Sequence, residues 1–376
     1  TVVGPPKGMR WTCGPEYARS HEHFASVSAM VTVGGRIFYI IDEGPISSVY
    51  LQSQWKLVAR DAFSGVLLWE RPLANWEARL RGFRSGPPEI GRRLVATSER
   101  VFVSLGYGEP VSVLDAATGS QITRLADTAG GCELLLTDGV LYVLADDRTV
   151  AEHSQRRDSI NQDFLRTAPT KEIWQRLPRN AFLGYGIQRI VAIKLETEVR
   201  SYARPSVEVA PSSPPSGDGS YRLLWTRQFD DPGEVMPTTL AVDDGSICCQ
   251  TVSHVVCLDA TTGKELWRSE RPVARSRFSW STPTLVIHDG VVLSLDRAES
   301  DNVDKSPPAR GPKWLINSGT KEYYQAGELV TFSLDNGQEL WRAPYSENYN
   351  TPGDIFVIDG AVWVGNLRLG SDPGFT

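Results

Sequence analysis

One short pattern recurs along this chain and limits the folds that the chain can adopt. Its clearest copy, residues 256–267, reads Val-Cys-Leu-Asp-Ala-Thr-Thr-Gly-Lys-Glu-Leu-Trp. An apolar run ends at Asp259, whose carboxylate can accept hydrogen bonds from turn amides, and Gly263 can adopt a positive φ without steric cost. The copy predicts two antiparallel strands joined by a tight turn, with Trp267 as a large apolar anchor on the second strand.

Related copies lie on both sides of this one. Residues 59–69 and 332–341 contain the aspartate, the glycine and the tryptophan, residues 113–119 lack the tryptophan, and residues 193–197 are separated from theirs by a long insertion. The positions to which we assign structural roles are Gly65, Gly119, Gly263 and Gly337 in the turns and Trp69, Trp225, Trp267 and Trp341 on the outer strands. A period of about 40 residues indicates repeats that bury their faces only against a neighbour, which favours a β-propeller.

The aspartates of the pattern are Asp61, Asp115, Asp259 and Asp335. Because they recur at what we interpret as one structural position, we predict that they cap turns and that they take no part in catalysis.

The fold class that we predict is all-β: a single β-propeller domain, residues 1–376, built from four-stranded antiparallel blades. The sequence supplies about five full blades and then two inner strands of a sixth, at 352–358 and 361–364. Either a terminal strand at 9–13 closes the ring, or the chain is a fragment of a ring with seven or eight blades. Insertions at about 146–188, 198–222 and 297–327 interrupt the blades.

Composition excludes several classes of function. The formal net charge is −6 and no run of Lys and Arg stands out, which argues against binding of nucleic acid. No apolar run reaches the roughly 18 residues of a membrane helix, and no secretory leader precedes Thr1, so we predict no transmembrane segment. The five cysteines have no metal-ligand spacing and are odd in number, which signals neither a zinc site nor a disulfide framework.

The run Asp-Ala-Thr-Thr-Gly-Lys-Glu-Leu-Trp at 259–267 resembles the tryptophan-docking repeats of pyrroloquinoline-quinone-like, or quinoprotein-type, β-propellers. The resemblance covers most of residues 25–364. It implies that the tryptophan of each outer strand packs over the following blade while its N–H reaches a backbone carbonyl. It also favours a periplasmic or other extracytoplasmic location, and a chain that is monomeric or part of a larger one.

The resemblance implies two different activities. Quinoprotein alcohol and sugar dehydrogenases bind pyrroloquinoline quinone (PQQ) and calcium in an eight-bladed ring, whereas the related outer-membrane assembly lipoprotein binds no cofactor and acts as a protein scaffold. The calcium ligands of the dehydrogenases do not map onto this chain residue by residue. Adjacent Cys248 and Cys249 are similar to a vicinal disulfide of some dehydrogenases, but they fall mid-strand, where successive side chains point to opposite faces, and we favour two buried thiols.

Chemistry in a propeller is expected at the channel mouth, where loops lead into the innermost strands. Four candidates for metal binding or acid–base catalysis follow from this placement: His21, His23, Glu133 and Glu234. The i, i+2 spacing of the two histidines directs both to one side of an extended segment, although solvated or hydrogen-bonded loop residues are the commoner explanation of such a pair. Candidates for binding a sugar or an acidic ligand are Arg84, Arg277, Trp280 and Asn350.

We therefore predict a propeller that acts as a binding or scaffold module, with a protein or a glycan bound at the channel mouth. The first alternative is an alcohol or sugar dehydrogenase dependent on PQQ and calcium. The second is a polysaccharide-active enzyme that uses the His and Glu residues of the mouth.

Overall fold

The structure is a computed structural model, and it describes residues 8–13, 27–45, 54–74, 92–106, 108–147, 187–195, 221–231, 234–236, 238–274, 283–297, 325–347 and 353–364. These residues form five four-stranded sheets and one two-stranded sheet. We number the sheets as blades 1 to 6 in chain order. The three predicted insertions lie almost entirely outside the described residues.

The strands of blades 1 to 3 are β1 (Val27–Val33), β2 (Arg36–Asp42), β3 (Trp55–Asp61) and β4 (Leu67–Pro72); β5 (Leu94–Ala96), β6 (Arg100–Ser104), β7 (Val111–Asp115) and β8 (Gln121–Leu125); and β9 (Gly131–Thr137), β10 (Val140–Asp146), β11 (Gln188–Leu195) and β12 (Tyr221–Gln228). A 3₁₀ turn, η3 (Ala126–Thr128), links blades 2 and 3.

The strands of blades 4 to 6 are β13 (Ala241–Asp243), β14 (Ser246–Gln250), β15 (His254–Asp259) and β16 (Glu265–Glu270); β17 (Thr284–His288), β18 (Val291–Arg297), β19 (Gln325–Ser333) and β20 (Glu339–Glu347); and β21 (Ile355–Ile358) with β22 (Ala361–Val364).

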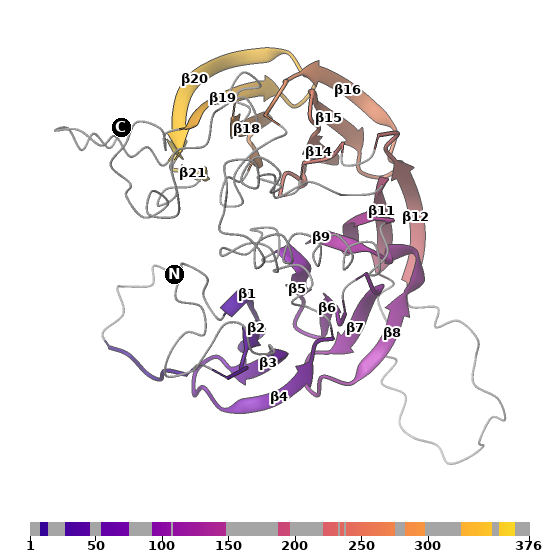
Figure 1. Ribbon diagram of the computed structural model, residues 1–376, viewed down its shortest axis with the longest axis vertical. Coiled ribbons are helices and arrows are strands. Elements are labelled where there is room, and N and C mark those ends of the chain that lie inside the picture. Colours follow the sequence, from indigo (N-terminus) through magenta and orange to yellow (C-terminus); the bar gives the residue numbers. More distant parts are fainter. Residues whose placement is uncertain are drawn as a thin grey trace, which may run out of the picture.

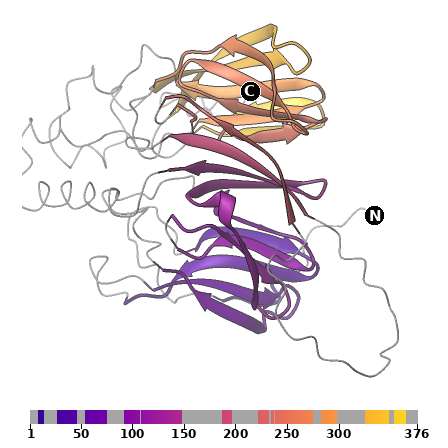
Figure 2. The ribbon, with the colours of Figure 1, turned by 90° about the vertical axis from the view of Figure 1, so that its right-hand side faces the viewer.

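The blades are antiparallel meanders that follow one another around a common centre. Within each blade every strand pairs with the next strand in the sequence, and the outer strands β4, β8, β12, β16 and β20 lie at the rim (Figure 1). The first strands β1, β5, β9, β13, β17 and β21 contact one another in that order. Figure 2 shows the blades side by side, from the indigo N-terminal blade to the yellow C-terminal one. The prediction of an all-β propeller with five full blades and a partial one is confirmed.

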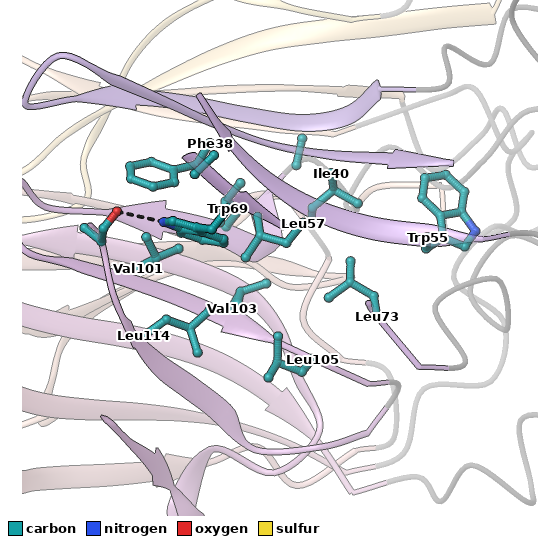
Figure 3. Packing of buried hydrophobic residues seen from close by; sticks show 14 residues of the cluster. Phe38, Ile40, Trp55, Leu57, Trp69, Leu73, Val101, Val103, Leu105 and Leu114 are labelled. Carbon is teal, nitrogen blue, oxygen red and sulfur yellow. Dashed lines mark hydrogen bonds between the residues drawn. The ribbon is translucent and has the colours of Figure 1, made fainter. Parts of the chain in front are cut away.

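The hydrophobic core lies between blades. One cluster of buried side chains joins blades 1 and 2, and further clusters join blades 2 and 3, 3 and 4, 4 and 5, and 5 and 6. In the first cluster, Trp69 lies among Phe38 and Leu57 of its own blade and Val101 of the next (Figure 3). A blade therefore buries its faces only when its neighbours are present.

The junctions between blades 1 and 2, 3 and 4, and 4 and 5 share one contact, in which an indole covers a turn glycine. The Nε1 of Trp69 donates to the carbonyl of Ala116 at 3.1 Å, and a Cβ built on Gly119 would lie 2.6 Å from the Trp69 ring. Trp225 on Gly263 and Trp267 on Gly337 repeat the arrangement, with Nε1 donating to Ala260 at 2.9 Å and Leu334 at 2.6 Å. Blade 2 has no such tryptophan, and buried Leu125 of β8 packs against blade 3 instead.

The N-terminal segment contributes a fourth docked indole. Trp11 donates from Nε1 to the carbonyl of Ala62 at 3.1 Å, and its ring lies over Gly65 in the turn of blade 1. Residues 8–13 form no strand, so the expectation of a closing strand at 9–13 is wrong as to secondary structure. The docking contact itself is present, and it gives Trp11 the place that an outer-strand tryptophan of a preceding blade would take.

Three aspartates close their turns as the sequence predicts. The Asp259 carboxylate accepts from the N–H of Thr261 at 3.0 Å and of Thr262 at 2.7 Å, and from the Thr262 hydroxyl at 2.7 Å. Asp61 and Asp115 accept the same three bonds in their own turns. These hydrogen bonds, above all the one from the Thr262 hydroxyl, lower the pKa of Asp259.

Asp335 does not belong to this set, which corrects the interpretation from sequence. The turn amides of Gly65, Gly119 and Gly263 donate to the carbonyl of the capping aspartate, whereas that of Gly337 donates to Ser333. Ser333 therefore occupies the aspartate position of blade 5. Asn336 stands where the other turns have Ser or Thr, and its side-chain oxygen accepts from the N–H of Gln338 at 2.9 Å.

The stabilising effect of the contact between indole and glycine can be tested with two glycines of blade 4. Gly263 (φ +70°) lies under Trp225, and Gly245 (φ +72°) has open space where a Cβ would go. We expect Gly245→Ala to lower the free energy of unfolding by about 1–2 kcal/mol, the cost of a left-handed backbone in an L-residue. Gly263→Ala should cost about 1–3 kcal/mol more because the methyl group displaces the indole. Urea denaturation measures both, and equal losses would show that docking does not stabilise the junction.

The capping carboxylates predict a dependence on pH. Since the pKa of Asp259 is lower in the folded chain than its unfolded value of about 3.9, its contribution is complete above that value and is lost as the pH falls through the folded pKa. Asp259→Ala should reduce the free energy of unfolding by about 1 kcal/mol at neutral pH and by less on acidification. Exposed Asp335 is the matched control, and Asp335→Ala should change stability by less than about 0.5 kcal/mol. A loss for Asp259→Ala that stays constant down to acid pH would contradict the capping role.

Candidate functional site

The structure describes two of the predicted site residues, Glu133 and Glu234. The other six lie outside the described residues: His21, His23, Arg84, Arg277, Trp280 and Asn350. Their assignment to metal, catalysis or ligand binding stays a prediction.

Glu133 lies on the inner strand β9 and is fully buried. One carboxylate oxygen accepts from Nη1 of Arg92 at 2.7 Å and from the N–H of Leu240 at 3.3 Å, and the other accepts from the N–H of Thr238 at 2.9 Å. Burial raises the pKa of Glu133, while Arg92 and the two backbone amides oppose that rise. Its oxygens are thus engaged in joining blade 3 to the segments that lead into blades 2 and 4.

These contacts belong to a series of polar ties between segments that lead into successive inner strands. Arg92 also donates to the carbonyl of Leu240 at 3.2 Å. The Thr238 hydroxyl donates to the carbonyl of Pro283 at 2.6 Å, and the Thr284 hydroxyl donates to that of Gly353 at 3.3 Å. Thr238 has a φ of +66°, a conformation that few residues with a Cβ adopt, and its N–H and its hydroxyl both take part. The mouth of blades 2 to 6 is therefore cross-linked by hydrogen bonds.

Glu234 stands closer to solvent. Its carboxylate accepts from the N–H of Asp231 at 3.4 Å and lies 4.0 Å from Nη1 of Arg268. The thiol of Cys249 lies within the electrostatic reach of both carboxylates: burial raises the pKa of Cys249, and Glu133 and Glu234 raise it further. Both predicted glutamates therefore disfavour ionisation of the Cys249 thiol.

A metal site is not assembled by the described residues. Nowhere among them do three His, Cys, Asp or Glu side chains gather in a way that would hold an ion. Glu133, the carboxylate expected to partner a metal, already accepts from one guanidinium and two amides. The described residues do not fit a calcium centre.

A second candidate surface, which we call the open edge, lies at blades 5 and 6. Trp341 pairs with Thr331 just as Trp267 pairs with Cys257 and Trp69 with Ala59, each next to a register shift, so it occupies the docking position of its blade. Trp341 is nevertheless 44% exposed, against 9% for Trp69. Four more exposed apolar side chains belong to the same two blades: Leu340, Phe356, Ile358 and Trp363.

Blade 6 has two strands in the part of the chain that the structure describes. Docked indoles cover the turn that follows the third strand of the next blade, and blade 6 has no third strand among these residues. The outer side of β22 is also unpaired there. Sequence reasoning assigned Trp341 a structural role and missed its exposure.

Comparison with known proteins identifies the family. The sequence pattern of the family described as outer membrane protein assembly factor BamB matches residues 53–181 and 218–359, which together make up more than half of the chain. The chain belongs to this family of PQQ-like β-propellers. The matched residues include the four turns that end at Gly65, Gly119, Gly263 and Gly337. They also include both predicted glutamates, Glu133 in the first segment and Glu234 in the second.

Individual relatives of this BamB-type chain are distant. It is 25% identical over 183 residues to the quinohemoprotein alcohol dehydrogenase ADH IIB of Pseudomonas putida, a match that covers 41% of this chain. The chain spans about a quarter of that dehydrogenase, because the match covers 26% of its length.

Solved structures with a similar fold include BamB from Moraxella catarrhalis, with 13% identity and a TM-score of 0.43 over 92% of this chain and 83% of that one. The WD40 domain of Neurospora crassa Pan2 has 10% identity and the same TM-score over 94% of this chain and 79% of that one. Among the described residues of this family member, no helix has the length and hydropathy to cross a bilayer.

The role of Glu133 can be separated from that of Glu234 by stability. We expect Glu133→Ala to lower the free energy of unfolding by about 3 kcal/mol, because it leaves the Arg92 guanidinium and two amides without their acceptor. Glu234→Ala, at the more exposed carboxylate, should cost less than about 0.5 kcal/mol. Urea denaturation of both variants is the measurement, and a Glu133→Ala variant as stable as the parent would contradict the structural role.

Proposed function

We propose that this chain is a noncatalytic propeller that binds a protein partner, and that the partner covers the open edge of blades 5 and 6. The observation that carries the proposal is Trp341, an indole in the docking register with 44% of its surface exposed. Exposed aromatic side chains beside an unpaired strand edge are a common feature of protein-binding surfaces. Membership of the family described as an outer membrane assembly factor supports a role in protein assembly.

The four docked indoles specify what such a partner must offer. Each covers a glycine in a tight turn and donates its Nε1 proton to the carbonyl of a turn residue. A partner of Trp341 therefore needs a turn with a glycine and a free carbonyl. An extended strand before that turn would pair with the outer side of β22 by β-augmentation, since the N–H and C=O groups there have no described strand opposite them.

The hydrogen bonds of Glu133 also support a noncatalytic role. A general acid or base must present a free proton-transfer site to a substrate, whereas the described hydrogen bonds occupy both oxygens of this carboxylate. The polysaccharide-active alternative therefore rests on Glu234 and on histidines outside the described residues.

Binding at the open edge is testable by site-specific photo-crosslinking in the cells that produce the protein. A photoreactive residue at Leu340, beside an intact Trp341, should give an adduct with a second protein. The matched control is Leu266 of β16, which precedes Trp267 as Leu340 precedes Trp341 and is equally exposed. We expect at least a tenfold lower yield at position 266. Equal yields at both positions, or an adduct only within the same chain, would overturn the proposal.

The dehydrogenase alternative is favoured by one observation, the 25% identity to a quinohemoprotein alcohol dehydrogenase. Its test is a titration of the purified protein with PQQ in the presence and absence of calcium, followed by absorbance and thermal shift. A ligand that binds the native state raises the Tm by mass action. Saturable, calcium-dependent binding would replace the scaffold proposal with a dehydrogenase. An unchanged Tm at all PQQ concentrations would agree with the scaffold proposal.

Ligand binding at the channel mouth remains a separate prediction for a protein or a glycan. Its first test is the effect of Glu234→Ala and His21→Ala on binding of the crosslinked partner. Weaker binding by either variant, with an unchanged free energy of unfolding, would indicate a second contact at the mouth. Unchanged binding by both variants would remove the prediction of a site there.

A further inference from the structure

Blade 4 contains a pair of cysteines that no part of the proposed function uses. Cys248 of β14 and Cys257 of β15 lie directly opposite each other in the register of the two antiparallel strands. Both side chains are fully buried. They share one cluster with Trp267 and Phe332, whereas Cys249 faces the opposite side of the sheet, in the cluster between blades 3 and 4.

The backbone hydrogen bonds determine which type of pair this is. Opposed residues of an antiparallel ladder alternate between hydrogen-bonded and non-hydrogen-bonded pairs. On one side the Ala260 N–H donates to the Gly245 carbonyl at 2.8 Å, and on the other the Thr251 N–H donates to His254 at 2.7 Å. Both are pairs of the same ladder, and each lies three steps from Cys248 and Cys257. An odd number of steps makes the cysteines a non-hydrogen-bonded pair.

This pair type brings the two sulfur atoms within bonding reach. Opposed Cα atoms lie about 4.5 Å apart in non-hydrogen-bonded pairs, against about 5.5 Å in the others. Disulfides span Cα separations of roughly 4.4–6.8 Å, so the strands need no large movement to accept a bridge. Adjacent Cys248 and Cys249 do not meet this condition, because consecutive residues of a strand point to opposite faces.

We propose that Cys248 and Cys257 form an intrachain disulfide when the chain folds in the presence of a disulfide oxidant such as glutathione disulfide. The Cys257 thiolate attacks one sulfur of glutathione disulfide and releases one glutathione. The Cys248 thiol then loses its proton and attacks the Cys257 sulfur of the mixed disulfide, which releases the second glutathione. Two protein thiols are oxidised to one disulfide, and one glutathione disulfide is reduced to two glutathione molecules.

The roles of the two thiols can be exchanged, because both are open to the oxidant before blade 4 closes. The thiolate is the attacking species in thiol–disulfide exchange. Because a bulky mixed disulfide does not fit a close-packed core, the exchange takes place while blade 4 is still open, during folding.

The experiment refolds the full chain from denaturant in a glutathione redox buffer and, in parallel, in a reductant. After refolding, the free thiols are counted under denaturing conditions and the linked peptides are mapped by mass spectrometry. We expect two of the five cysteines to be lost as free thiols and one linked peptide pair that contains Cys248 and Cys257. Cys249→Ala should give the same bridge, and Cys257→Ala should leave all its remaining thiols free.

Two results would overturn the proposal. The first is a chain that refolds to the same β-rich circular dichroism spectrum in both buffers with all five thiols free. The second is a bridge that maps elsewhere, above all between Cys248 and Cys249, which Cys249→Ala would abolish. Because the oxidant reaches both thiols during refolding, burial in the native state could not explain thiols that stay free.

Discussion

The indole that covers a glycine is the contact on which the ring depends, because a four-stranded blade cannot bury both of its faces alone. The turn must have glycine, since any Cβ would collide with the ring. The third and fourth strands of a blade shift register after this turn, in blade 2 without a tryptophan as well. Such a shift precedes or adjoins the tryptophan of blades 1, 3, 4 and 5. Apolar contact holds the junction, and the indole N–H fixes its geometry through one turn carbonyl.

Toward the centre of the ring the junctions are polar. The inner strands of blades 2 and 4 have three residues each, β5 and β13, and offer little apolar surface to their neighbours. Arg92, Glu133 and Thr238 supply the missing connection through short hydrogen bonds in a site without water access to the carboxylate. A buried carboxylate is unfavourable unless its oxygens are occupied, so the same bonds that satisfy Glu133 also fix the relative positions of three blades.

Sequence reasoning could predict the blades because their signals are local: strand periodicity, a turn glycine and a capping aspartate lie within about a dozen residues of one another. Contacts between distant residues could not be predicted in this way. The hydrogen bond from Thr238 to the candidate Glu133 joins residues 105 positions apart in the chain. The capping assignment of Asp335 failed for a local reason, since it stands two residues before its glycine and the other aspartates stand four before theirs. The pairing of Cys248 with Cys257 required the register of two strands, which hydrophobic pattern alone does not fix to a single residue.

Function and stability draw on one interaction in this propeller. Trp11, Trp69, Trp225 and Trp267 are each satisfied by a turn of the same chain, and Trp341 stands in the same register without such a turn among the described residues. The exposed Trp341 indole lacks the burial that stabilises the other four. A partner that covers this indole would remove its apolar surface from water, which would favour binding. The four docked indoles therefore show the geometry that we expect between Trp341 and a partner at the open edge.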